Sequence, residues 1–205
     1  ALAPIEGKYL STYVDPNAEV EFTKQPTNQE GALSTSAVNF LTQYEQSGGN
    51  KPMVGGSITV DQTVLNYKGK RRESLVGTAS AGPMADSLDT AEWKKFVADY
   101  KANFKDGFPS PSLFAYLYYI NTKAALDGLD AVKGDLSGGQ NKYREALQKT
   151  KFVGPAGEVV IDANRNGVGP TYITEVTKAA DGSLFNKVVK TVPNITQTLG
   201  LPEAE

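Results

Sequence analysis

The apolar residues of this chain follow a helical period in its middle and a strand period towards its end. Helical spacing is found from Trp93 to Phe104, from Leu113 to Ala124 and from Tyr143 to Leu147, so each segment is predicted to be an amphipathic helix. Short strands are predicted at Met53-Val54 and at 73–78. The middle of the chain therefore alternates strands with helices, which is typical of an α/β fold.

The last part of the chain carries strand patterns without helices between them. The segments 158–162, 171–177 and 184–192 read as strands, and the turn "ADGS" joins the last two as a hairpin. We therefore expect an α/β domain with appended antiparallel strands. Towards the N-terminus, 8–14 and 19–22 are predicted strands, and a helix is expected to begin at Ser34 and to end at Gly48-Gly49.

The composition excludes several kinds of chemistry. The 205 residues include no cysteine and no histidine, so disulfides, structural zinc, Ser–His catalysis and Cys–His catalysis are all excluded. The net charge of −2 gives no basic footprint for nucleic acid. No apolar run approaches the ~20 residues that would span a bilayer, so we expect a soluble protein that suits a periplasm as well as a cytosol.

The stretch "VGGSIT" at 54–59 raises the question of a ligand site. It lacks the lysine of a phosphate loop and the three spaced glycines of a dinucleotide fingerprint. Thr59 and Gln62 instead fit a capping box, which predicts a tight turn from strand to helix. Ser57 and Thr59 would follow the carboxyl end of a strand, where open α/β sheets bind ligands. Spacing alone leaves a plain turn and a ligand site equally open.

Two acidic patterns have competing interpretations. "DANRNG" at 162–167 matches the start of a calcium loop, but Ile173 stands where the bidentate glutamate belongs, so a turn between strands is favoured. Asp86 and Asp89 are a carboxylate pair of the kind that glycosidases use. Because no activated nucleophile accompanies them, we favour a helix start there and expect no enzyme, no metal and no cofactor.

The order of several segments resembles a known family. "AVNFLTQYEQSGGNKPMVGGSITVDQTVL", "ESLVGTASAG", "WKKFVADYKANF", "PSLFAYLYYINTKAALDGL" and "YREALQKTKFVGPAGEVVIDANRNG" are similar to the C-terminal half of the type I periplasmic solute-binding proteins of branched-chain amino acid-type ABC transporters. The resemblance covers roughly 32–198, so 32–205 is assigned to this C-terminal portion and 1–31 is left unassigned. Because family members are longer, the resemblance implies an incomplete periplasmic-binding-protein-like fold of Rossmann-type lobes. We expect a fragment, a rearranged chain or a naturally reduced form.

The resemblance also implies a function and a set of ligand contacts. Ser57 matches a family position that is often an acid pairing with the ligand ammonium, and Phe114 matches one that packs on the ligand's apolar end. Because Ser57 is neutral, it favours aliphatic or aromatic carboxylates over α-amino acids. Further contacts are expected from Thr59, from Ser80 in the loop after the strand at 73–78, and from Ser34 and Thr35 at a helix start.

The implied protein is a non-catalytic, periplasmic component that clamps a small carboxylate-bearing solute, either branched-chain amino acid-like or an aliphatic or aromatic acid. It delivers this solute to the membrane permease of an ABC transporter. A ligand-sensing receptor module of the same fold is the alternative. The resemblance gives no reason to expect nucleic acid as a partner.

Overall fold

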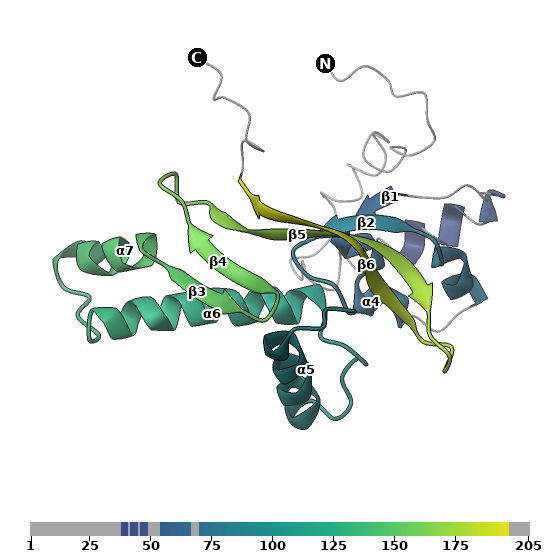
Figure 1. Cartoon of the computed structure of the whole chain (residues 1–205), viewed down its shortest axis with the longest axis horizontal. Helices are drawn as coiled ribbons and strands as arrows, with labels where there is room; N and C mark the ends of the chain where they lie inside the picture. The colour runs from purple at the N-terminus through teal and green to yellow at the C-terminus, as the bar shows by residue number, and fades with distance from the viewer. Residues whose placement is uncertain (1–37, 41, 45, 49–53, 67–69, 197–205) are drawn as a thin grey trace, which may run out of the picture.

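The computed structural model describes residues 38–40, 42–44, 46–48, 54–66 and 70–196, and a six-stranded sheet forms its frame. The strands run in the spatial order β1-β2-β5-β4-β3, and β6 pairs with β5 (Figure 1). Their bounds are β1 Val54–Gly56, β2 Ala79–Gly82, β3 Lys151–Gly154, β4 Gly157–Ile161, β5 Gly167–Lys178 and β6 Leu184–Ile195.

The long hairpin of β5 and β6 connects the two parts of this sheet. Towards its start β5 pairs with β4, and further along it pairs with β2. Only β1 and β2 are parallel, with Gly56 opposite Ala81, whereas all the other pairs are antiparallel. The predicted combination of α/β elements with antiparallel C-terminal strands is therefore confirmed, and the expected "ADGS" turn joins β5 to β6.

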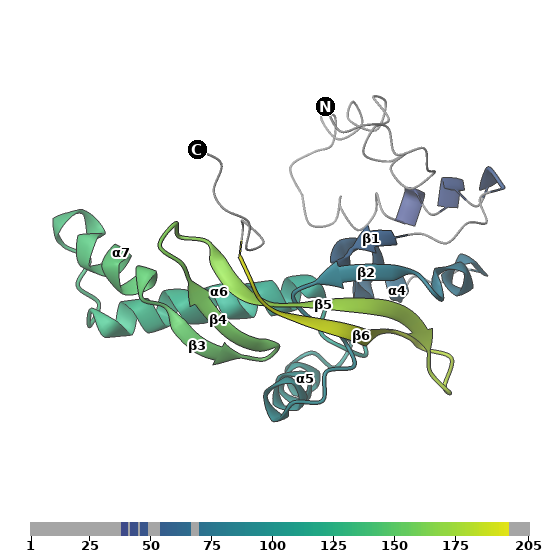
Figure 2. The ribbon, with the colours of Figure 1, turned by 45° about the horizontal axis from the view of Figure 1, so that its top comes forward.

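Helices lie along one side of the sheet. The long helix α6 runs beside β3 and β4, and α5 lies near its start (Figures 1 and 2). Ser112 caps α6 and Thr90 caps α5, because each hydroxyl accepts a hydrogen bond from an amide of the first turn. The helices are α4 Gln62–Leu65, α5 Ala91–Asn103, α6 Leu113–Ala131 and α7 Asn141–Gln148, so the three predicted helices of the middle of the chain are confirmed.

Buried apolar side chains gather in two separate clusters. The first, which we call the α6 core, combines α5 and α6 with the chain before α5 and with β5: Met84, Ala85, Trp93, Phe96, Leu113, Tyr116, Ala156 and Tyr172. The second, which we call the α4 core, lies at the other end of the hairpin: Val60, Val64, Leu65, Leu75, Val176 and Leu184. The hairpin contributes to both, since Tyr172 and Val176 belong to the same strand.

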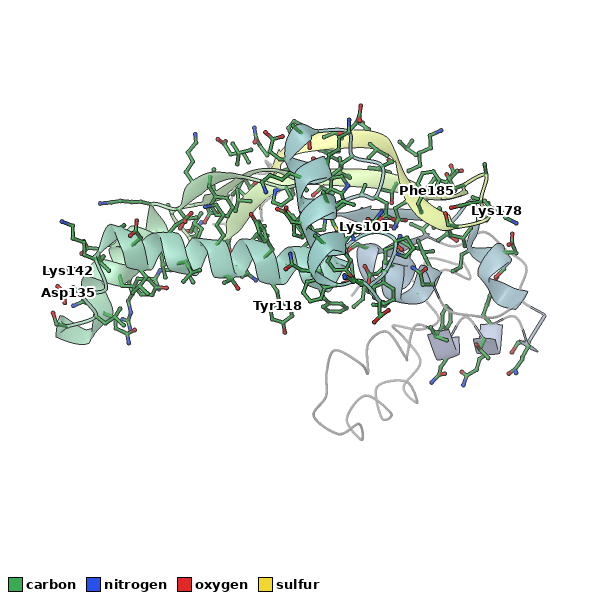
Figure 3. The ribbon with its side chains drawn as sticks, turned by 90° about the horizontal axis from the view of Figure 1, so that it is seen from below. Lys101, Tyr118, Asp135, Lys142, Lys178 and Phe185 are labelled. Atoms are coloured by element: carbon green, nitrogen blue, oxygen red, sulfur yellow. The ribbon has the colours of Figure 1, made fainter. Side chains whose placement is uncertain are left out.

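The molecule is elongated from the end that α6 and α7 form to the end at the turn of the β5–β6 hairpin. The ion pair of Asp135 and Lys142, with 2.7 Å between Oδ2 and Nζ, marks the end formed by α6 and α7, while Lys178 and Phe185 mark the opposite end (Figure 3). None of the helices within the described ranges is long and apolar enough to cross a membrane.

Two predicted elements differ in the structure. The predicted strand at 73–78 is wrong: Lys70–Leu75 form a 3-10 helix, and the strand follows at β2. Consequently Ser80 lies within a strand and not in a loop after one. The "DANRNG" segment is a hairpin turn between β4 and β5, in which Asp162 Oδ1 accepts a hydrogen bond from the Asn166 amide at 2.8 Å. The predicted strands at 8–14 and 19–22 lie outside the described residues.

Candidate functional site

The carboxyl ends of β1 and β2 bring Ser57 next to Gly82. Both residues come directly after the paired positions Gly56 and Ala81 of the two parallel strands. A methyl group added to Gly82 would lie 2.4 Å from Ser57 Cβ, so only glycine leaves room for the serine there. Ser57 is partly exposed, and no hydrogen bond joins its hydroxyl to another described side chain. The hydroxyl is thus available to a ligand at the edge of the sheet.

Thr59 has a structural role in the same bend. Its hydroxyl donates to the Gly56 carbonyl at 2.7 Å and closes the 3-10 helix Ser57–Val60. The expected capping box is wrong, because α4 begins at Gln62 and is capped by Asp61, whose Oδ2 accepts from the Thr63 amide. A side chain at Gly55 would come within 2.1 Å of Thr59 Oγ1, which explains the first glycine of the pair.

Asp61 connects this bend to the helix that carries Phe114. The Leu113 amide donates to Asp61 Oδ1 at 2.5 Å across a separation of 52 residues. Leu113 is the first residue of α6 and Phe114 the second, so Phe114 lies where α6 meets the bend. Phe114 is partly exposed, whereas Tyr118, one turn later, is 59% exposed and points away from the sheet (Figure 3).

Among the described residues, Ser80 is the remaining predicted contact residue. Ser80 is buried within β2, and the Thr174 hydroxyl of β5 donates to it at 3.3 Å. The Ser80 side chain is therefore not exposed to a solute. Ser34 and Thr35 lie outside the described residues.

Asp86 and Asp89 do not form a carboxylate pair. Asp89 is fully exposed beside Lys94, which lowers the pKa of its carboxyl by hydrogen bonding and by charge. Asp86 Oδ2 accepts hydrogen bonds from Gln62 Nε2 and from the Asn186 amide, while Oδ1 is buried without a partner. Burial raises the pKa of Asp86 above its ordinary value. The expected helix start is confirmed, because α5 begins at Ala91 directly after its N-cap Thr90, although neither aspartate is the cap.

Sequence reasoning missed the two residues that shape this edge. The predicted capping box of Thr59 and Gln62 places Asp61 inside the first turn of a helix, although an aspartate directly before Gln62 is a good N-cap by type. Gly82 belongs to an ordinary "AGP" loop pattern, and nothing in the sequence pairs it with Ser57. Only the parallel register of β1 with β2 brings the two together.

A groove of about 390 Å³ lies elsewhere, between α6, α7 and β3. Asp127, Lys142, Lys149 and Phe152 are among its lining residues, and none of the predicted contact residues belongs to it. Among the described residues there is no group of three or more acidic side chains that could hold a metal ion.

Comparison with solved structures gives the same fold. A substrate-binding protein of an ABC transporter from Sphaerobacter thermophilus is 27% identical, with a TM-score of 0.67, 78% of this chain covered and 42% of the other. A solute-binding protein from Rhodopseudomonas palustris, solved with 3,4-dihydroxybenzoic acid, is 25% identical, with a TM-score of 0.68 and coverages of 78% and 43%. A leucine-binding protein from Thermotoga maritima shares the fold at 19% identity, with a TM-score of 0.59 and coverages of 78% and 42%.

The chain thus spans less than half the length of these structures, which agrees with the expected incomplete fold. No curated protein matches the sequence. The family model described as "Periplasmic binding protein" matches residues 31–182. That match takes in β1, β2, the helices α4 to α7 and the whole of β5, and it confirms the resemblance found in the sequence. The chain belongs to the periplasmic binding protein family, with the type I fold of the ABC-transporter members.

Proposed function

We propose that this chain supplies part of the solute site of an extracytoplasmic, non-catalytic binding protein that serves an ABC transporter. The solute is a small molecule with a carboxylate, aliphatic or aromatic, which is handed to a membrane permease. The single observation that carries the proposal is the Ser57 hydroxyl, which stands available beside Gly82 at the carboxyl ends of two parallel strands.

The chemistry of this edge favours a carboxylate over an α-amino acid. A hydroxyl donates to a carboxylate oxygen but provides no negative charge for an ammonium group, and an unpaired buried ammonium is costly. Asp61 is a poor partner for such an ammonium group, because it is only 4% exposed and both of its oxygens already accept hydrogen bonds from Leu113 and Thr63. The aromatic ring of Phe114 suits the apolar end of such a solute. A relative of 25% identity was solved with 3,4-dihydroxybenzoic acid, which supports an aromatic acid as the first compound to test.

The test is calorimetric titration of the chain with 3,4-dihydroxybenzoate, 4-hydroxybenzoate and leucine. We expect the acids to bind without being consumed and leucine to bind more weakly. Ser57→Ala should weaken acid binding by roughly 1–2 kcal/mol, as the loss of one hydrogen bond does. The matched control is Ser137→Ala, because Ser137 bonds only to Asp135 at the far end of α6 and should leave binding unchanged. Unchanged affinity in Ser57→Ala would remove Ser57 from the site.

A further inference from the structure

A buried polar cluster separates the α6 core from the α4 core. Its side chains come from three distant parts of the chain, and they are Asp61 and Gln62, Asp86, and Asn186. Three polar atoms at this boundary are buried without a partner: Asp86 Oδ1, Asn186 Oδ1 and Ser110 Oγ. Polar groups are costly to bury between two apolar clusters. The presence of this polar cluster therefore needs an explanation other than the stability of the two cores.

Asp61 makes the contact of this cluster that bears on the proposed site. Its exposure is only 4%. Oδ2 accepts from the Thr63 amide at 3.2 Å and from the Thr63 hydroxyl at 2.9 Å, which fixes the carboxyl on the α4 side. Oδ1 accepts from the Leu113 amide at 2.5 Å on the α6 side. One carboxyl group therefore joins the first residues of two helices.

The contact also occupies the positive end of α6. The first amides of a helix attract an anion, and here a buried carboxyl of the chain itself takes that place. Ser112 satisfies the Ala115 amide in the same turn.

The residues on both sides of Asp61 are those proposed to contact the solute. Ser57 lies four positions before it, within the 3-10 helix that leads into Asp61. Phe114 is the neighbour of Leu113, whose amide Asp61 binds. Ile58, which follows Ser57, packs against the α6 core and so also holds the Ser57 bend close to α6.

We propose that Asp61 is a positioning residue of the solute site, which holds the Ser57 bend against the first turn of α6 and thereby fixes Ser57 relative to Phe114. Gln62 and Asn186 add a second tie through Asp86. The proposal rests on the proposed function, and its test separates the two.

Two variants of Asp61 differ in how many of its carboxyl oxygens remain to accept hydrogen bonds. Asp61→Ala removes both, whereas Asp61→Asn keeps one oxygen, which can serve Leu113 or Thr63 but not both. Asp89→Asn is the matched control, because Asp89 is exposed and pairs with Lys94 only. Thermal unfolding of each variant shows which of them remain folded, and the first measurement below needs no ligand.

The first measurement is the distance between the α4 side of the molecule and α6. Because the chain contains no cysteine, Val76→Cys and Leu126→Cys can carry two spin labels at exposed positions on the α4 side and on α6. We expect one narrow distance distribution for the parent chain and for Asp89→Asn, a broad one for Asp61→Ala, and an intermediate one for Asp61→Asn. An unchanged distribution in folded Asp61→Ala would overturn the proposal.

The second measurement asks whether Asp61 acts through Ser57. With 3,4-dihydroxybenzoate as the probe, Asp61→Ala should weaken binding by about tenfold in the parent chain but only by about twofold in the Ser57→Ala background. Equal losses in both backgrounds would refute positioning through Ser57. If the parent chain binds none of the tested acids, the proposed function is wrong and the site role of Asp61 falls with it. If the parent binds and Asp61→Ala binds as tightly, only the Asp61 proposal is wrong.

Discussion

At the scale of single residues, the bend "VGGSIT" shows why a sequence pattern left two interpretations open. Gly55 is explained by a close neighbour within the bend, Thr59, whereas nothing lies within 4 Å of Gly56. The glycine that makes room for Ser57 is Gly82, which is 25 positions away in the sequence and comes close only in the folded sheet. The type of residue at Ser57 was readable from the sequence, and its accessibility was not. That accessibility depends on the register of β1 against β2, which a single sequence does not specify.

Replacement of Gly82 by alanine tests this close approach. The added methyl would lie 2.4 Å from Ser57 Cβ, so Ser57 must move, and solute binding should weaken together with a loss of about 1–3 kcal/mol in the free energy of unfolding. The matched control is Gly56→Ala, where nothing lies within 4 Å and φ is −72°, so alanine fits. Urea unfolding and calorimetry measure both effects. Equal behaviour of the two variants would contradict the geometry.

At the scale of elements, helices were predicted well and the short strands poorly. The stripes that begin at Trp93 and Leu113 encode helices through their own spacing, so α5 and α6 appear where expected. In contrast, β2 consists of Ala79, Ser80, Ala81 and Gly82, residues without strand preference, and it is a strand because β1 and β5 pair with it on its two sides. The segment 73–78 has a more strand-like sequence, but it does not form a strand. Of its two apolar residues, Leu75 is buried in the α4 core and Val76 is exposed.

A side-chain hydrogen bond adds to the backbone pairing that holds the β3–β4 hairpin against β5. The buried Tyr172 hydroxyl donates to the Ala156 carbonyl at 2.7 Å, and Ala156 lies in the turn between β3 and β4. Tyr172→Phe leaves that carbonyl buried and unpaired, so we expect the free energy of unfolding to fall by about 1–3 kcal/mol. Tyr119→Phe is the control, because Tyr119 is 46% exposed and keeps its ring contact with Phe96. Urea denaturation that gave equal midpoints for the two variants would refute the role of this bond.

At the scale of the whole molecule, two apolar cores share one hairpin and meet at a polar boundary. The sequence predicted the hairpin from its alternation and its "ADGS" turn, but it did not predict the division into two cores. The division arises because Tyr172 packs into the α6 core and Val176 of the same strand packs into the α4 core. These contacts are made only in the folded chain. The same boundary joins Gln62, Asp86 and Asn186, whose hydrogen-bonded pairs lie 24 and 100 residues apart in the sequence and so leave no local pattern to recognise.

The boundary makes stability depend on pH through Asp86. Burial is the main cause of its raised pKa, and the charge of Asp61 adds to it, whereas the hydrogen bonds from Asn186 and Gln62 and the nearby Ser110 hydroxyl oppose it. The folded chain therefore holds the proton of Asp86 at pH values where the unfolded chain has lost it. From the ordinary pKa of 3.8 up to the raised one, this residue makes the free energy of unfolding fall as pH rises, and above that window its contribution is constant.

Asp86→Asn should remove this dependence without removing the contacts. The amide oxygen can take the place of Oδ2 and accept from Gln62 and Asn186, while the amide NH₂ replaces the unpartnered Oδ1 near Ser110. We expect the variant to be more stable than the parent at pH 7, by on the order of 1 kcal/mol, and to match it more closely at acidic pH. Urea unfolding from about pH 4 to pH 8 measures the difference between the two chains. Asp89→Asn is the control, because the pH dependence that Asp89 gives to the free energy of unfolding has the opposite sign. Lys94 lowers the pKa of the exposed Asp89, so the small contribution of Asp89 to stability is lost as pH falls. A parent and an Asp86→Asn variant that differed by the same amount at every pH would show that Asp86 does not titrate between the two cores.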